Sequence, residues 1–162
     1  QLMIDLNIRV GNEIYLKEND TTGLCTMQKK NFKDNSLCFK GKRGVIHTKI
    51  LDNKHIEFIR NLLNLPGKFL FQYLDNSKIQ LINSNDLNDF LKIYVDKNLS
   101  TKDIRTYQAN QLFKKFINEN KKNFNNLKKL QTAAIKYTSE ELGNTIKVCK
   151  DSYINPNNLI YK

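Results

Sequence analysis

The chain has 162 residues and carries 27 lysines and arginines against 16 aspartates and glutamates, which gives a formal net charge of +11. A hydrophobic content of 40% argues against wholesale disorder, and the length predicts a single domain over residues 1–162. The charge favours a polyanion such as nucleic acid over a membrane, because no basic amphipathic helix and no apolar run of membrane-spanning length is present.

The first third of the chain predicts a helix followed by a β-hairpin. An apolar pattern over residues 2–9 indicates a buried helix that stops at Gly11. The chain begins inside this pattern, so we expect a fragment of a longer protein. Residues 24–27 are expected to form a short strand. The stretch SLCFKGKRGVIHTKI, residues 36–50, combines apolar alternation with a glycine-flanked turn and predicts the hairpin.

The middle of the chain predicts two more helices. Apolar spacing indicates a helix over 53–64, which the Pro-Gly pair at 66–67 ends. KFLFQY, residues 68–73, is expected as a short extended segment, and a second helix is expected over 84–96.

The last third predicts three helices. Ser100 begins a capping-box pattern, so a helix should run to about residue 119. A second apolar face starts at Leu127 and ends at Gly143, and a short final helix should cover 147–153. The predicted fold is therefore mainly α with a small β-hairpin or sheet, an α+β domain.

Arg105 breaks the pattern of its predicted helix. It shares a face with Ala109, Leu112 and Phe116, so a charge heads an apolar stripe. A guanidinium in this place needs a partner. Two explanations are equally good: a buried ion pair with an aspartate, or a bound anion.

Arg9 repeats this arrangement, because it falls on one helical face with Leu2 and Leu6. A cation in the last turn of a helix is also favoured by the helix dipole. Two arginines at the edges of core faces nevertheless favour one shared oxyanion, since a guanidinium matches a phosphate with two parallel hydrogen bonds.

Two further residues leave alternatives open. Lys42 lies at the predicted hairpin tip, where it is either a solvated charge or a mobile proton donor. Tyr153 follows a basic segment and is either a core aromatic or a nucleophile.

Cys25, Cys38 and Cys149 form an odd set without C-x-x-C spacing, which indicates reduced thiols in an intracellular protein. His47 and His55 lack the spacing of paired metal ligands. We therefore expect no metal site.

Four stretches in one order carry a family resemblance: IRVGNEIY (8–15), FKGKRG (39–44), KDIRTYQAN (102–110) and LGNTIKVCKDSYINP (142–156). Together they resemble the catalytic domain of type IB DNA topoisomerases of the small poxvirus-like and bacterial kind. The fold implied is the catalytic-domain fold that these enzymes share with tyrosine recombinases.

The resemblance implies a role for each matching residue. Arg9 and Arg105 would contact the non-bridging oxygens of the scissile phosphate, and Lys42 would protonate the departing 5′ oxygen. Tyr153 would form a 3′-phosphotyrosyl link, and Asn144 would donate a hydrogen bond to a phosphate oxygen. Further DNA contacts are expected from Tyr15, Arg43, Lys147 and Lys150.

The resemblance also implies double-stranded DNA as the partner and no cofactor, because the bond energy is kept in the protein–DNA link. Small relatives carry an N-terminal domain that closes over DNA, so we expect a monomeric clamp whose other half is missing here. The expected location is inside a cell, at DNA, in the cytoplasm or the nucleus.

Three alternatives remain at this point. A tyrosine recombinase shares the arginine–lysine–arginine–tyrosine set, but recombinases usually read H-x-L-R-H where this chain has KDIRT, residues 102–106. A non-catalytic DNA-binding module would use only the positive charge. A plain helical interaction domain would bind an acidic protein.

Overall fold

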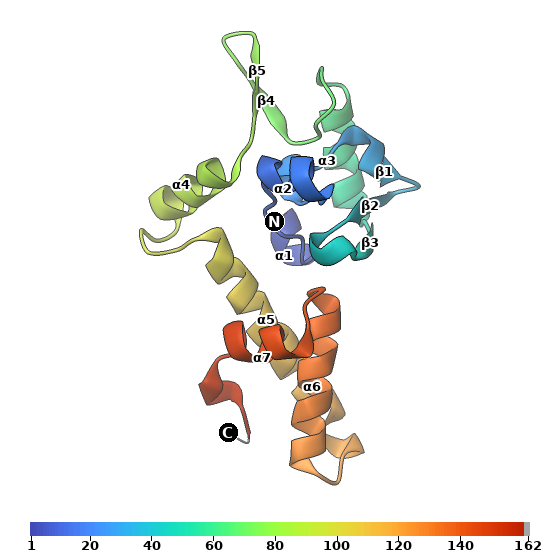
Figure 1. Ribbon diagram of the computed structural model, residues 1–162, viewed down its shortest axis with the longest axis vertical. Helices are drawn as coiled ribbons and strands as arrows, with labels where there is room; N and C mark the ends of the chain where they lie inside the picture. Colours follow the sequence, from blue (N-terminus) through green and yellow to red (C-terminus); the bar gives the residue numbers. More distant parts are fainter. Residues whose placement is uncertain (161–162) are drawn as a thin grey trace. The chain divides into compact units, whose positions relative to one another are not determined.

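The structure is a computed structural model that describes residues 1–160 (Figure 1). The fold is mainly helical with small antiparallel sheets, which confirms the predicted fold class. The chain divides into two compact units, Gln1–Thr101 and Lys102–Lys162. The single domain expected over 1–162 stays a prediction.

The first unit is built on a three-stranded antiparallel sheet with β2 (Ser36–Lys40) between β1 (Phe32–Lys33) and β3 (Ile46–Ile50). The predicted hairpin is therefore confirmed, whereas the short β1 was not predicted. In β2, Leu37 and Phe39 point into the core, at 0% and 6% exposure. The alternation read from the sequence is thus the alternation between the two faces of the sheet.

The first unit also contains the helices α1 (Leu2–Asp5), α2 (Glu13–Asn19) and α3 (Asn53–Leu63). The α3 helix agrees with its prediction, and its Ile59 packs with Met27 and Leu70 in a core where all three are fully buried. The α2 helix was not predicted.

The first predicted helix is wrong in its extent. It ends at Asp5, and Asn7 then adopts a left-handed conformation (φ 55°), which stops the helix before Arg9. Arg9 therefore does not continue a helical face with Leu2 and Leu6.

The strand predicted over 24–27 is also wrong, because residues Leu24–Thr26 form a 3₁₀ turn. The hydroxyl of Thr26 accepts a hydrogen bond from the backbone N–H of Gly23, which closes the turn locally. The remaining 3₁₀ turns are Lys29–Asn31, Lys42–Gly44, Lys121–Asn123 and Pro156–Asn158.

A second hairpin follows, made of β4 (Gln72–Asp75) and β5 (Lys78–Leu81), and it leads into α4 (Ser84–Tyr94). The extended segment predicted over 68–73 covers only the start of β4, and β5 was not predicted. The helix predicted over 84–96 is confirmed.

The second unit consists of α5 (Thr101–Asn120, whose first residue belongs to the first unit), α6 (Leu127–Glu141) and α7 (Ile146–Ser152). All three helices agree with their predictions. Residues from all three share one core, in which Ala109, Ala134 and Cys149 are fully buried. Figure 1 shows α7 beside α6. None of the helices among residues 1–160 is long and apolar enough to cross a membrane.

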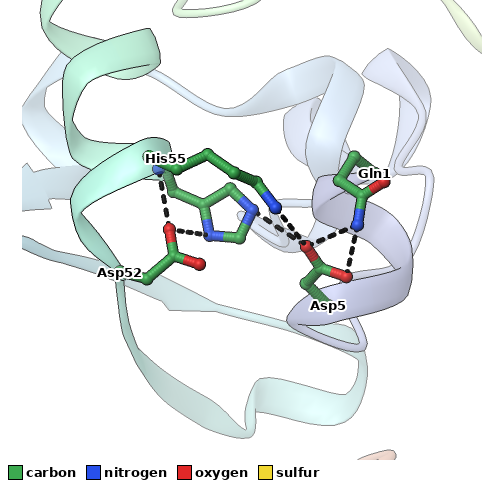
Figure 2. A network of polar contacts seen from close by, with 5 residues as sticks. Gln1, Asp5, Asp52 and His55 are labelled. Carbon is green, nitrogen blue, oxygen red and sulfur yellow. Dashed lines mark hydrogen bonds and ion pairs between the residues drawn. The ribbon is translucent and has the colours of Figure 1, made fainter.

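A buried histidine joins α1 to the start of α3 (Figure 2). The Nε2 of His55 lies 3.0 Å from a carboxylate oxygen of Asp5, and its Nδ1 lies 2.9 Å from one of Asp52. Asp52 also caps α3, because its carboxylate accepts the backbone N–H of His55 at 2.8 Å. Lys54 approaches the same carboxylate oxygen of Asp5 as His55 does, and the Gln1 amide donates to both oxygens. The network links α1 to the start of α3.

This network predicts a pH-dependent stability. The Gln1 amide, helped by Lys54 and His55, holds the pKa of Asp5 below its ordinary value, although burial acts in the opposite direction. Because the folded-state pKa is the lower one, the ionised carboxylate stabilises the fold above the unfolded-state pKa, and this contribution is lost as the pH falls through the folded-state pKa. Asp5→Asn should therefore lower the Tm at pH 7, and this effect should disappear as the pH falls through the folded-state pKa of Asp5.

Thermal unfolding of both proteins from pH 7 into the acid range measures the difference in Tm. Glu57→Gln is the matched control, since Glu57 is exposed on α3 and outside this network. A difference between parent and Asp5→Asn that stays constant across the range would contradict the role of Asp5.

Candidate active site

The guanidinium of Arg105 is held inside the second unit by the end of another helix. Arg105 is 7% exposed on α5 and donates hydrogen bonds to the carbonyl oxygen of Leu142 and, at 3.4 Å, to the side-chain oxygen of Asn144. Leu142 caps the C-terminus of α6, where carbonyl oxygens lack helical partners and the dipole is negative. These acceptors explain how a charge is tolerated at the head of an apolar face.

The turn between α6 and α7 places Asn144. Gly143 takes a left-handed conformation (φ 58°), and the backbone N–H of Asn144 donates to the carbonyl of Ser139 at 2.8 Å. Thr145 then caps α7, with its hydroxyl accepting the N–H of Val148. The Gly-Asn-Thr sequence thus ends one helix, turns Asn144 toward Arg105 and begins the next helix.

Tyr153 lies at the C-terminal cap of α7, half-buried against the core of the second unit. Its backbone N–H donates to the carbonyl of Cys149 at 3.2 Å. The Cζ atom of Arg105 lies 5.7 Å from the centre of the Tyr153 ring, within cation–π range. The structure therefore brings together three predicted residues, Arg105, Asn144 and Tyr153.

The neighbouring thiol does not compete as a nucleophile at neutral pH. Burial raises the pKa of Cys149 to about 11, against a smaller opposite effect of Arg105. Burial and the charge of Asp86 likewise raise the pKa of Cys25 to about 11 in the first unit. Both residues are therefore thiols at neutral pH, and the thiolate is the reactive form.

Arg9 lies in an irregular segment of the first unit. Its carbonyl oxygen accepts the N–H of Leu24 at 2.8 Å, and the next carbonyl accepts that of Cys25 at 2.8 Å. A Cβ at Gly23 would lie 2.4 Å from the Cα of Gly11, so a side chain there would push the segment away. Gly23 therefore helps to place Arg9, and the sequence analysis missed it; its only signal was a glycine next to a wrongly predicted strand.

Lys42 and Arg43 lie exposed in the turn that joins β2 to β3. The turn closes with a bond of 2.7 Å from the Gly41 N–H to the carbonyl of Val45. The left-handed conformations fall on Arg43 (φ 64°) and Gly44 (φ 77°), whereas Gly41 leaves room for the ring of His47. Lys42 is thus exposed at the tip of a hairpin whose strand β2 packs into the core.

The remaining predicted DNA contacts are exposed. Tyr15 lies on α2 in the first unit, and Lys147 and Lys150 lie on α7 in the second. The predicted site residues are divided between the two units. The first unit contains Arg9, Tyr15, Lys42 and Arg43, and the second contains Arg105, Asn144, Lys147, Lys150 and Tyr153.

The sequence analysis also passed over Asn110, on α5. Its side chain contacts the backbone of Tyr153. The only signal in the sequence was an asparagine at the end of the KDIRTYQAN stretch. Among residues 1–160, no three His, Cys, Asp or Glu side chains are grouped as metal ligands would be.

Comparison with known proteins adds a family. The protein family described as "Eukaryotic DNA topoisomerase I, catalytic core" matches residues 1–156. DNA topoisomerase 1B of Acanthamoeba polyphaga mimivirus is 34% identical over 95% of this chain and 50% of its own length. DNA topoisomerase 1 of Rabbit fibroma virus (strain Kasza) is 32% identical, and DNA topoisomerase 1B of Vaccinia virus (strain Copenhagen) is 31% identical, each over 91% of this chain and 47% of its own length. The chain thus spans about half the length of these relatives.

Proposed function

Because the chain belongs to the type IB DNA topoisomerase catalytic-core family, we propose that it cleaves and reseals one strand of double-stranded DNA through Tyr153. Relaxation of supercoils follows when the nicked strand swivels before it is resealed. The observation that carries the proposal is the cluster of Arg105, Asn144 and Tyr153 in the second unit.

The cleavage step forms one bond and breaks another. The phenolic oxygen of Tyr153 attacks the scissile phosphorus and loses its proton to solvent, while the bond from phosphorus to the 5′ oxygen breaks. The products are a 3′-phosphotyrosyl link and, once Lys42 has given its proton to the 5′ oxygen, a free 5′ hydroxyl. Resealing is the reverse attack of that hydroxyl on the phosphotyrosine, so the phosphodiester energy is conserved.

Arginines stabilise the extra negative charge of the five-coordinate transition state. A guanidinium presents paired donors that match two phosphate oxygens, and Arg105 is already held by the end of α6 before DNA binds. Asn144 would add a neutral donor through its amide. Arg9, in the first unit, would supply the second guanidinium.

The net charge of +11 supports binding to the DNA backbone. Tyr15, Arg43, Lys147 and Lys150 would contribute contacts to phosphates, and all four side chains are exposed. We further propose a monomeric clamp, in which a region that corresponds to the unmatched half of the relatives closes on the opposite side of DNA.

Incubation of the chain with a supercoiled plasmid, followed by a detergent quench, tests the proposal. We expect relaxed topoisomers without added nucleotide, and nicked plasmid that carries covalently attached protein. Tight salt-dependent binding without any adduct would instead indicate a non-catalytic DNA-binding module. Strand exchange that needs paired specific sites would indicate a recombinase.

The proton-donor role of Lys42 predicts a dependence on the leaving group. Lys42→Ala should slow cleavage of ordinary DNA by about 100-fold, the lower range for general acid catalysis. On DNA with a sulfur atom at the 5′ leaving position, the loss should nearly vanish, because a thiolate leaves without a proton. Single-turnover cleavage rates on both substrates measure the difference.

Arg43→Ala is the matched control, since Arg43 is the exposed neighbour in the same turn. It should weaken DNA binding and slow cleavage of both substrates to the same small extent. Equal losses on the two substrates for Lys42→Ala would count against the role of proton donor.

A further inference from the structure

One side-chain amide on α5 holds the backbone on both sides of Ile154. The Nδ2 of Asn110 donates to the carbonyl oxygen of Tyr153 at 2.9 Å, and its Oδ1 accepts the backbone N–H of Asn155 at 2.8 Å. The amide therefore contacts one backbone acceptor and one backbone donor of the segment 153–155, as a neighbouring strand would.

These contacts are made where α7 has just ended. Tyr153 is the C-terminal cap residue, and the chain turns into the 3₁₀ turn Pro156–Asn158. Backbone groups beyond a helix end lack helical partners and need others. Asn110 supplies them for the residue that bears the nucleophile and for the residue two positions later.

A second asparagine closes the arrangement. The 3₁₀ turn bends the chain back, with the N–H of Asn158 donating to the carbonyl of Asn155 at 2.8 Å. The side chain of Asn158 then donates to Oδ1 of Asn110 at 2.6 Å. We call Asn110 and Asn158 together the asparagine clip.

The asparagine clip connects the backbone of Tyr153 to the helix that carries Arg105. Asn110 and Arg105 both belong to α5, and a second bond of 2.7 Å from Nδ2 to the carbonyl of Thr106 fixes the Asn110 side chain on that helix. Because a helix is rigid over five residues, the clip holds the backbone of Tyr153 in a constant position relative to the backbone of Arg105.

We propose that Asn110 and Asn158 are positioning residues, which hold the Tyr153 segment against α5 so that the Tyr153 ring stays beside Arg105. The inference rests on the proposed function of Tyr153 as nucleophile. Neither asparagine touches the reacting atoms, so the clip acts on the orientation of the nucleophile and not on DNA binding.

Single-turnover cleavage of a supercoiled plasmid at saturating protein tests the clip. Asn110→Ala should slow formation of the covalent adduct by about 10- to 100-fold, because a misplacement of about 1 Å costs as much. Asn158→Ala removes the hydrogen bond from the Asn158 side chain to Asn110 and should slow adduct formation by about fivefold. The double variant should be no slower than Asn110→Ala, because both changes disrupt one arrangement.

Asn120→Ala is the matched control on the same helix. Its Nδ2 donates to the carbonyl of Phe116 at 3.0 Å, four residues earlier, as that of Asn110 does to Thr106. This variant should cleave at the parent rate. The affinity for uncleaved plasmid should be unchanged in all variants, which a general loss of structure would not produce.

Amide hydrogen exchange supplies a readout without DNA. The Asn155 N–H is bound by Asn110, whereas those of Tyr153 and Ile154 are bound by Cys149. Asn110→Ala should therefore accelerate exchange at Asn155 far more than at Tyr153 and Ile154. Unchanged exchange at Asn155 would overturn the clip, even if the variant were inactive for other reasons.

The remaining outcomes are also decisive. An active parent with Asn110→Ala at the parent rate, or a double variant slowed by the product of the single losses, would overturn this inference and leave the proposed function intact. A parent that forms no adduct under any condition would overturn the proposed function and the positioning role with it.

Discussion

Replacing Tyr153 with phenylalanine should abolish the covalent adduct with DNA and all relaxation of supercoiled plasmid. The change removes one oxygen and leaves the ring, which is half-buried against the second core and 5.7 Å from the Arg105 guanidinium. Folding and DNA binding should therefore persist, while no other group at this place can form the phosphotyrosyl bond. A detergent-quenched plasmid assay measures the adduct, and filter binding measures the affinity.

Tyr137→Phe is the matched control. Tyr137 is also half-buried in the second unit, on α6, where its ring packs 5.1 Å from that of Phe116. It should retain the parent rates of cleavage and relaxation. An adduct that still forms with Tyr153→Phe would show that another residue is the nucleophile.

Replacing Arg105 with alanine should slow cleavage by about a thousandfold, because one guanidinium donor to a phosphoryl transition state is worth at least that much. Arg105→Lys should remain severely impaired, since an ammonium keeps the charge but cannot present two parallel donors. Both variants should bind uncleaved plasmid with affinities close to the parent's, because one phosphate contact among many is lost.

A loss of folding must be separated from this loss of chemistry, because Arg105 also donates to Leu142 at the end of α6. Cleavage is therefore compared at a temperature where circular dichroism shows each variant to be folded. Lys102→Ala, an exposed change on the same helix, serves as the control. Folded Arg105 variants that cleave at the parent rate would remove Arg105 from the proposed mechanism.

Periodicity predicted the long elements well and the short ones poorly. Helices α3, α5 and α6 and strand β2 bury apolar side chains at regular spacing, so their period is visible in the sequence, whereas no residue of α4 or β3 is buried. Residues Leu24–Thr26 form a 3₁₀ turn where a strand over 24–27 was predicted, and the first helix ends before Arg9. In both places the outcome depends on single backbone contacts, such as the approach of Gly23 to Gly11 and the left-handed Asn7.

The candidate site was also predicted only in part from the sequence. The residue types and their order in IRVG, GKRG, RTY and LGNT were sufficient to recognise the family, and the match over residues 1–156 agrees with that recognition. The roles assigned to Arg9, Lys42, Arg105, Asn144 and Tyr153 remain predictions until the variants are measured.

By itself, the sequence determined the fold class, the family and a short set of candidate residues, because these depend on local spacing and residue type. Only the tertiary structure decided what surrounds those candidates. It placed Asn144 against Arg105, the ring of Tyr153 beside the same guanidinium, and Asn110 against the backbone of the tyrosine. These contacts join residues 39 to 48 positions apart. They exist because helices α5, α6 and α7 pack around one core, and no local pattern encodes which polar side chains meet there.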